Sequence, residues 1–219
     1  MASEDELRKQ ICEAGRRMYA KNLVSATDGN ISVRLASEQF LVTPKGSTVG
    51  FMKPEDLIIA DAAGKKISGD GAVSSEFTTH LAAYEERPDI ECVVHAHPPK
   101  AVGFTLAGIG LDRLLLPEVV FALGRIPTAR YATPATLEGG EAIRELIREC
   151  DALLLDRHGA VTVGSGVMDA YFKMEKIEHA AESILTAHLL GAPQELTSDE
   201  MTRILAAREA YGAHGKLFL

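Results

Sequence analysis

The sequence lacks the features that define membrane, secreted and nucleic-acid-binding proteins. It contains no apolar run close to the roughly 18 residues that span a bilayer. Its N-terminus, MASEDELRKQ, is polar and acidic, with no signal-peptide core behind it. Acidic residues outnumber basic ones by 31 to 23, which gives a net charge of −8. We therefore expect neither a membrane nor a nucleic acid as partner, although a local site can still bind a phosphate.

Cysteine is also scarce, with only Cys12, Cys92 and Cys150. Their number is odd and each lies in an apolar context, which predicts small buried side chains in a reducing compartment and no disulfide framework. The sequence has no internal repeat, low-complexity tract or linker. We expect a cytoplasmic protein whose residues 1–219 form a single domain.

Hydrophobic spacing predicts a hairpin-rich first half with helices interspersed. Strands are expected at 31–35, 40–43, 57–60, 92–97, 152–155 and 161–163, and helices at about 4–22, 76–86, 100–110, 137–150, 169–190 and 197–211. Segment 114–131 is not assigned. This order predicts an α/β fold in which helices cover a mixed or mainly antiparallel sheet, and it argues against a regular doubly wound sheet.

The run 92–99, Cys-Val-Val-His-Ala-His-Pro-Pro, carries two histidines at the end of a predicted buried strand. Alternate side chains of a strand share a face, so His95 and His97 point the same way, roughly 7 Å apart along the chain. The two prolines lack the N–H that a ladder needs and end the strand. This spacing suits a metal ion, but two hydrogen-bonded histidines at a strand end explain it equally well.

A third histidine, His158, follows another buried strand and precedes Gly159. Three histidines at strand ends, without four local Cys or His ligands, are typical of a catalytic zinc site, in which an open position accepts the substrate. The alternative is three unrelated histidines. His80, in the middle of a predicted helix, is expected to have a structural or surface role.

Glu76 is the candidate base, and it follows two serines at the start of a predicted helix. Ser74 or Ser75 is expected to be the N-cap. Two hydroxyls with free backbone N–H groups at a helix start can hold an anion without a basic residue. The turns at 29–30 and 43–46 can also present N–H groups to a phosphate. Alone, Glu76 is explained equally well as a partner of the helix dipole.

The sequence resembles the class II aldolase/adducin family over nearly its whole length, from the first helix to Tyr211. Five separated motifs occur in the order and spacing of that family: Gly29-Asn30, Thr43 to Gly46, Ser74-Ser75-Glu76, His95-Ala96-His97 and Arg157-His158-Gly159. Within the family, the likeness is strongest to the L-fuculose-1-phosphate aldolases.

This resemblance implies a three-layer α/β/α fold, a C4 homotetramer and one zinc ion per subunit. The implied zinc ligands are His95, His97 and His158, and Glu76 is implied to ligate the metal without substrate and to act as acid/base. Three imidazoles also bind manganese or cobalt. The residues implied to hold the substrate phosphate are Gly29, Asn30, Thr43, Gly46, Ser74 and Ser75. The implied reaction cleaves a ketose 1-phosphate to dihydroxyacetone phosphate and an aldehyde, through a metal-stabilised ene-diolate.

The sequence departs from the fuculose enzymes at one place. Those enzymes use a tyrosine from a neighbouring subunit on the aldehyde oxygen, whereas segment 114–125 contains none. Glu118 lies nearest to that position, as a proton-transfer group or a plain surface carboxylate. Tyr211 matches a C-terminal tyrosine of the family, although a Tyr that closes a helix often only packs. The resemblance therefore leaves the aldehyde part of the substrate open, and L-fuculose 1-phosphate, a 5-deoxypentulose 1-phosphate and 5-methylthioribulose 1-phosphate all fit the implied metal and phosphate site.

Two other functions fit the same motifs. Methylthioribulose-1-phosphate dehydratases resemble this sequence in the zinc histidines and the phosphate turns, but they eliminate water. An adducin-like interaction module would use the fold as a scaffold without catalysis. Retention of the three histidines and Glu76 argues against the scaffold, because a scaffold needs no imidazoles at strand ends. The related pentulose-phosphate epimerases fit less well, because their Thr-His-Ala-Asp segment is absent.

Overall fold

A computed structural model of the protein describes residues 2–35 and 38–219. Within these residues the helices are α1 (Glu4–Ala20), α2 (Phe77–Glu86), α3 (Pro99–Leu106), α4 (Pro117–Leu123), α5 (Glu138–Ile147), α6 (Val167–Leu190) and α7 (Ser198–Tyr211). The strands are β1 (Asn30–Arg34), β2 (Gln39–Val42), β3 (Ile58–Asp61), β4 (Lys66–Ser68), β5 (Cys92–Ala96), β6 (Thr128–Ala129), β7 (Ala152–Leu155) and β8 (Gly159–Gly164). Each predicted element is present, and α4, β4 and β6 were not predicted.

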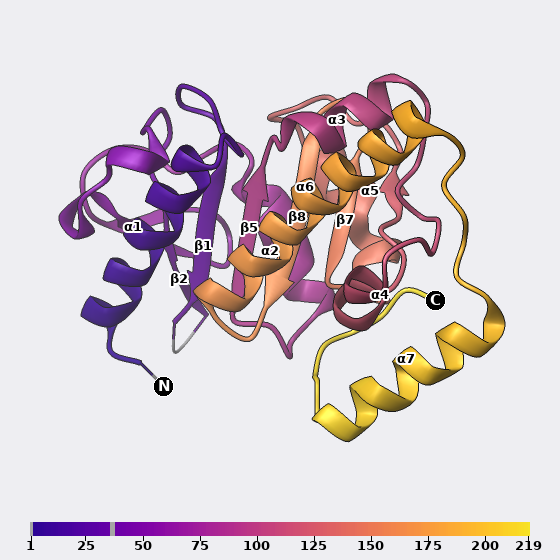
Figure 1. Ribbon diagram of the computed structural model, residues 1–219. Helices are drawn as coiled ribbons and strands as arrows, with labels where there is room; N and C mark the ends of the chain where they lie inside the picture. The colour runs from indigo at the N-terminus through magenta and orange to yellow at the C-terminus, as the bar shows by residue number, and fades with distance from the viewer. Residues whose placement is uncertain (1, 36–37) are drawn as a thin grey trace.

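The strands form one sheet in the order β4-β3-β2-β1-β5-β8-β7-β6 (Figure 1). Every neighbouring pair is antiparallel except β6 and β7. The prediction of a mainly antiparallel sheet is therefore confirmed. The strands β1 to β4 pair in the order of the chain, whereas β5 pairs with β1 and β8, which are distant from it in sequence. This non-local pairing brings residues from three parts of the chain to one end of the sheet.

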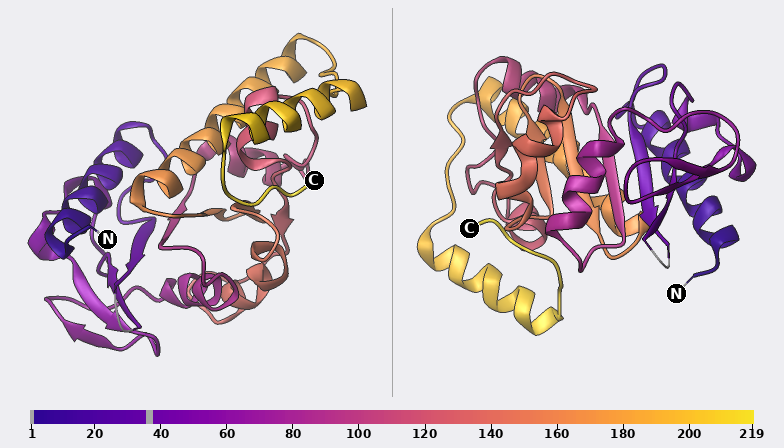
Figure 2. Two further views of the ribbon diagram at one scale, coloured as in Figure 1. Left: turned by 90° about the horizontal axis from the view of Figure 1, so that it is seen from below. Right: turned by 180° about the vertical axis from the view of Figure 1, so that it is seen from behind.

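Helices cover both faces of the sheet, so the α/β/α layering is confirmed (Figure 2). Successive side chains of β5 point to opposite faces of the sheet. Val94 packs on the face covered by α1, α3 and α6, and Val93 packs on the face covered by α2 and α5. Each layer has its own apolar core, in which Met174 and Ile143 are fully buried. Burial of both faces explains why β5 reads as a continuous apolar run.

The C-terminal helix α7 packs on α4 at the periphery, with none of its residues buried (Figure 1). Thr197 and Glu200 form the capping box that its sequence predicts. All three cysteines are buried and free, as expected. No helix in the described residues has both the length and the apolar character needed to traverse a bilayer.

Candidate metal centre and catalytic site

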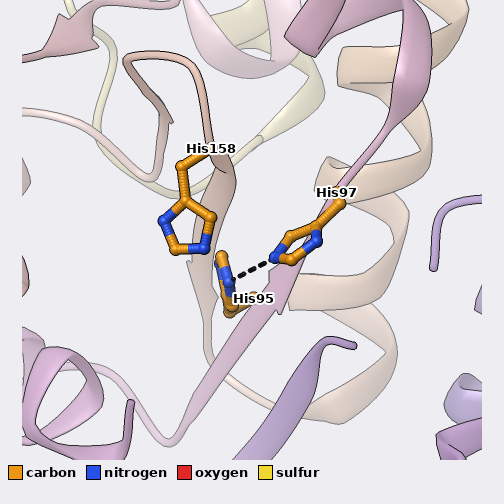
Figure 3. A group of neighbouring side chains, drawn as sticks. All are labelled: His95, His97 and His158. Carbon is orange, nitrogen blue, oxygen red and sulfur yellow. Dashed lines mark hydrogen bonds between the residues drawn. The ribbon is translucent and has the colours of Figure 1, made fainter. Parts of the chain in front are cut away.

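The three predicted histidines lie together at one end of the sheet (Figure 3). His95 is near the end of β5, His97 follows the strand, and His158 lies in the turn between β7 and β8. Each pair of rings is 4.9 Å apart between centroids. One nitrogen from each ring can be chosen so that all three lie within 4.8 Å of one another. The structure thus brings the three rings together, and metal binding by them stays a prediction.

Local backbone features hold the rings in place. Pro99 opens α3 directly after the strand, as proline does at the first position of a helix. Arg157 has a positive φ of 56°, which lets the chain reverse just before His158. At Gly159 a Cβ atom would lie 2.4 Å from the carbonyl oxygen of Ala96 and 2.8 Å from the ring of His97. Only glycine therefore fits at the start of β8.

The hydrogen bonds of the rings favour a cation between them. The Nδ1 of His95 lies 3.0 Å from the carbonyl oxygen of Ala160, which can only accept, so Nδ1 carries the proton and Nε2 is a lone pair. The Nδ1 of His97 faces a carboxylate oxygen of Asp28 at 3.6 Å, which favours the same tautomer. The two Nε2 atoms then face each other at 3.0 Å (Figure 3). Two facing lone pairs repel unless a cation or a proton lies between them, so this donor set fits a divalent metal.

Burial keeps the imidazoles of His95 and His97 neutral, which is the form that binds metal. It lowers the pKa of His95 to about 3, against the opposing effect of the Glu76 carboxylate. It also lowers the pKa of His97, to which the nearby His158 contributes. We conclude that the rings of His95 and His97 are in the ligand form near neutral pH.

Glu76 lies against the histidines, as its predicted role requires. Its Oε1 is 3.2 Å from Nε2 of His158, and its Oε2 is 3.5 Å from Nε2 of His95. Burial raises the pKa of Glu76, but the hydrogen bond with His158 and the electrostatic interaction with the three imidazole rings outweigh burial and lower the pKa to about 2. The carboxylate is therefore ionised near neutral pH and faces the position between the rings.

The start of α2 differs from the expectation. The helix begins at Phe77, and Glu76 itself occupies the N-cap position, so the assignment of the cap to Ser74 or Ser75 was wrong. Ser74 still supports this turn, because its Oγ accepts from the Glu76 N–H at 3.3 Å and its carbonyl accepts from the Phe77 N–H at 3.1 Å. This turn places the carboxylate beside the histidines, ahead of the first helical turn.

A cavity of about 380 Å³ opens beside Glu76, His97 and His158. Five of the six residues predicted to hold a phosphate line it: Gly29, Asn30, Gly46, Ser74 and Ser75. The two glycines have positive φ of 75°, which the turns require. The structure therefore places the three predicted turns around one space, and their contact with a phosphate stays a prediction.

Two members of the predicted phosphate set have other partners. Thr43 is buried and does not line the cavity, because its hydroxyl accepts a hydrogen bond from the Ile31 N–H at 3.2 Å. Its contribution is to fix β2 against β1. The side-chain amide of Asn30 lines the cavity but donates to Oε2 of Glu76 at 3.0 Å. Asn30 therefore orients the candidate base.

Six residues that line this cavity are not among the predicted site residues: Thr27, Asp28, Pro44, Lys45, Pro134 and Ala135. Lys45 lies in the predicted phosphate turn 43–46, but only the backbone N–H groups of that turn were expected to contribute, and the Lys45 side chain was given no role. Asp28 lies beside the predicted Gly29. Pro134 and Ala135 form a further part of the wall, and Ala135 has an unusual φ of 62°. Nothing in the sequence marks that loop, because its approach to Glu76 depends on the fold.

The two remaining candidates lie outside this cavity. Glu118 is in the first turn of α4, and Tyr211 is the last residue of α7. The Tyr211 side chain is 82% exposed, and its ring centroid lies 5.9 Å from that of Phe121. Within one chain neither residue reaches the site, so a role for either in a neighbouring subunit stays a prediction.

Comparison with known proteins places this geometry in a family. Residues 9–185 match the model of the class II aldolase and adducin N-terminal domain. A 5-deoxy-D-ribulose 1-phosphate aldolase of Bacillus thuringiensis serovar kurstaki is 34% identical over 211 residues, which cover 94% of this chain and 96% of the relative. A 3-oxo-tetronate 4-phosphate decarboxylase of Cupriavidus necator is 31% identical over 190 residues, which cover 85% of this chain and 87% of the relative. Decarboxylation was not among the reactions predicted from the sequence.

A solved structure of an L-fuculose-1-phosphate aldolase of Thermus thermophilus has the same fold, with a TM-score of 0.74 and 32% identity. The match covers 87% of this chain and 98% of that chain. Class II aldolases are lyases that generally depend on a metal, which agrees with the cluster of three histidines. The chain belongs to the class II aldolase and adducin family.

Proposed function

We propose that the protein is a zinc-dependent aldolase that cleaves a ketose 1-phosphate to dihydroxyacetone phosphate and an aldehyde. The observation that carries this proposal is the position of Glu76, whose carboxylate lies against His95 and His158 and beside the cavity lined by the three polar turns. A base, a metal-ligand set and an anion-binding space within one cavity are the parts that such a cleavage needs.

Each residue has a role in this mechanism. His95, His97 and His158 would hold the zinc ion, which supplies Lewis-acid polarisation of the substrate carbonyl. Glu76 gives a proton to C3 of the departing ketone during cleavage and removes that proton during condensation. Asn30 keeps the carboxylate turned toward C3.

The phosphate would be bound by the turns around the cavity. Gly29, Gly46, Ser74 and Ser75 offer backbone N–H groups and hydroxyls. Lys45 adds a positive charge to the same wall, which complements a dianionic phosphate in a cavity that also contains Asp28 and Glu76. The phosphate group then fixes the distance between the substrate carbonyl and the base.

We propose a 5-deoxypentulose 1-phosphate as the first substrate to test, ahead of L-fuculose 1-phosphate and 5-methylthioribulose 1-phosphate. The support is the 34% identity to the 5-deoxy-D-ribulose 1-phosphate aldolase along almost the full length of both chains. Cleavage between C3 and C4 would release acetaldehyde from this substrate, lactaldehyde from the fuculose compound and a methylthio-aldehyde from the third.

Decarboxylation of a 3-oxo acid phosphate is the second candidate, favoured by the relative from Cupriavidus necator. Loss of carbon dioxide from a 3-oxo-tetronate 4-phosphate leaves the same ene-diolate that carbon–carbon cleavage of a ketose 1-phosphate leaves. The same metal ligands and phosphate turns serve both reactions. Elimination of water by a dehydratase, and an adducin-like interaction without catalysis, are ranked below these two reactions because no relative described above carries out either.

The deciding experiment separates the proton transfer from the choice of aldehyde. Zinc-loaded protein is incubated with dihydroxyacetone phosphate in D₂O, and loss of the C3 hydrogen is followed by NMR. We expect exchange in the wild type, and a loss of about 100-fold or more in Glu76→Gln with zinc still bound, because an amide cannot accept the proton. A near-normal rate in Glu76→Gln would refute the assignment of the base.

An aldehyde panel then identifies the substrate. Condensation of dihydroxyacetone phosphate with acetaldehyde, lactaldehyde or methylthioacetaldehyde supports the aldolase and names its partner. Release of carbon dioxide from 3-oxo-tetronate 4-phosphate, with no condensation, supports the decarboxylase. Protein that binds no divalent metal and is not activated by zinc supports the scaffold.

We also propose that the protein acts in the cytoplasm as a homotetramer, in which a neighbouring subunit could bring Glu118 or Tyr211 to the aldehyde side. Light scattering on the purified protein measures the subunit number. Glu118→Gln and Tyr211→Phe should lower aldol turnover without lowering the exchange of dihydroxyacetone phosphate, because the aldehyde takes no part in that half-reaction. Full turnover in both variants would exclude these residues.

A further inference from the structure

A row of polar side chains on β1 faces a second row that begins at Glu76 and continues along α2. On β1 these side chains alternate along the strand, so they share one face, and on α2 they are four residues apart, so they lie one above another. We call this contact the β1–α2 seam; its members are Asn30, Ser32 and Arg34 from β1, His80 and Tyr84 from α2, and Glu76 at the N-cap of α2.

Hydrogen bonds connect the two rows at each level. Asn30 donates its amide to Glu76 at 3.0 Å at the upper end. In the middle, Oγ of Ser32 lies 2.7 Å from Nδ1 of His80 and 2.9 Å from the hydroxyl of Tyr84. Tyr84 also donates to the carbonyl of Ser32 at 2.9 Å. The candidate base is therefore bonded to β1 at one level, and the Ser32, His80 and Tyr84 group bonds α2 to β1 at the next level along the same two elements.

The seam is unusual in its unpaired atoms. Among the described residues, the buried side-chain nitrogen and oxygen atoms without a hydrogen-bond partner are Oδ1 of Asn30, Nε of Arg34 and Nε2 of His80. All three belong to the seam. Each unpaired buried polar group costs about 1–3 kcal/mol. Apolar side chains between β1 and α2 would avoid this cost and give a more stable contact. The polar residues of the seam are therefore better explained by positioning of the neighbouring Glu76 than by stability.

The hydrogens of the seam can be assigned from what each partner is able to do. The carbonyl of Ser32 only accepts, so it takes the proton of Tyr84. The hydroxyl of Ser32 then donates to the Tyr84 oxygen and accepts from Nδ1 of His80. Burial keeps His80 neutral by lowering its pKa to about 4, so its single proton lies on Nδ1. The chain from His80 through Ser32 and Tyr84 to the carbonyl runs in one direction and satisfies every hydroxyl.

We propose that His80 is a positioning residue for Glu76: by its bond to Ser32 it fixes the first turns of α2 on β1, so that the Glu76 carboxylate faces the three histidines. Glu76 precedes α2 by one residue and has no side-chain capping bond of its own, so its direction depends on where the helix lies. A displacement of a catalytic group by about 1 Å can lower a rate by about 100-fold. This inference rests on the proposed role of Glu76 as the base.

The test compares His80→Leu with His80→Asn. Leucine removes the bond to Ser32, whereas the amide nitrogen of asparagine replaces Nδ1 as a donor. We expect His80→Leu to exchange the C3 hydrogen of dihydroxyacetone phosphate about 10-fold to 100-fold more slowly, with unchanged zinc affinity and KM. His80→Asn should recover most of that rate. Thr162→Val is the matched control, because it removes a buried hydroxyl bond to Ala170 outside the seam and should leave the rate unchanged.

A normal exchange rate in a folded His80→Leu protein would overturn the proposal, and so would a parallel loss of zinc affinity, which would place the effect on the histidines. A reduced rate in Thr162→Val equal to that in His80→Leu would also overturn it, because general loss of stability would then explain both. If His80→Leu does not fold, Tyr84→Phe removes one hydroxyl from the same chain and should slow exchange by about tenfold.

A second measurement is independent of the substrate. The visible absorption of cobalt-loaded protein reports the groups around the ion, and the Glu76 carboxylate lies against the ring nitrogens. We expect the spectrum of His80→Leu to move toward that of Glu76→Gln, with Thr162→Val unchanged. If the wild type exchanges no hydrogen, the proposed aldolase fails while this spectrum still tests the seam. A His80→Leu spectrum identical to that of the wild type would overturn the positioning role.

Discussion

The stability of the metal-free protein should fall in mild acid because His80 is buried as a neutral imidazole. Burial lowers its pKa from the usual 6.5 to about 4. As the pH drops below 6.5, the unfolded chain takes up a proton at this residue that the folded chain does not, so unfolding becomes more favourable. The difference is fully developed below pH 4. At pH 5 it amounts to about 2 kcal/mol, since one pKa unit corresponds to about 1.36 kcal/mol.

Urea unfolding of the EDTA-treated protein at pH 7.5 and pH 5.0 measures this loss. His95 and His97, whose pKa values burial also lowers, add to the loss in the wild type. His80→Asn keeps those two residues and removes only the titration of His80. We therefore expect the fall in unfolding free energy between the two pH values to be about 2 kcal/mol smaller in the variant. An equal fall in both proteins would refute the reasoning that His80 is held neutral.

Three further substitutions test the site and its frame. His95→Ala should lower zinc affinity by more than about 100-fold and abolish activity in parallel, because one of three ligands is lost; metal analysis and exchange assays check this together. Gly159→Ala should lower zinc affinity by about 10-fold to 100-fold, since its Cβ would push the ligand rings. Gly166→Ala, where a Cβ meets nothing within 4 Å, is the control and should bind zinc normally in the same competition titration. Arg87→Met should reduce the unfolding free energy by about 2 kcal/mol in urea titrations, because the buried Asp151 keeps only its ion pair with Lys173 and the Ile147 and Cys150 carbonyls lose their donor.

Much of the fold follows from local patterns in the sequence. The continuous apolar runs of β5 and β7 predict buried strands, and the structure shows both buried in every residue. The apolar residues of the long helix α6 recur along its whole length, so the sequence predicts a helix at 169–190, within two residues of the observed bounds Val167–Leu190. The segment 114–131 could not be assigned because α4 has seven residues and β6 has two, which are too short to show a period.

The candidate site was predictable in part. Strand alternation placed His95 and His97 on one face, whereas only the pairing of β5 with β8 brings His158 to them. Spacing alone could not show that Thr43 has a backbone partner or that Asn30 contacts Glu76, because both bonds cross between elements. Ala135 lines the cavity and has a φ of 62°. Alanine rarely adopts this left-handed conformation, so its presence in the sequence does not predict the conformation of the loop.

The order of the strands has a consequence for how the protein would acquire the proposed metal ion. Two ligands come from the end of β5 and the third from the turn before β8, so the three meet only after these distant strands have paired. If the proposed zinc ion binds here, it would therefore bind tightly only after β5 and β8 have paired, and it would not start the folding of this chain. Zinc that binds to the folded protein would raise the free energy of unfolding by about 4 kcal/mol when it is present at about 1,000 times its Kd.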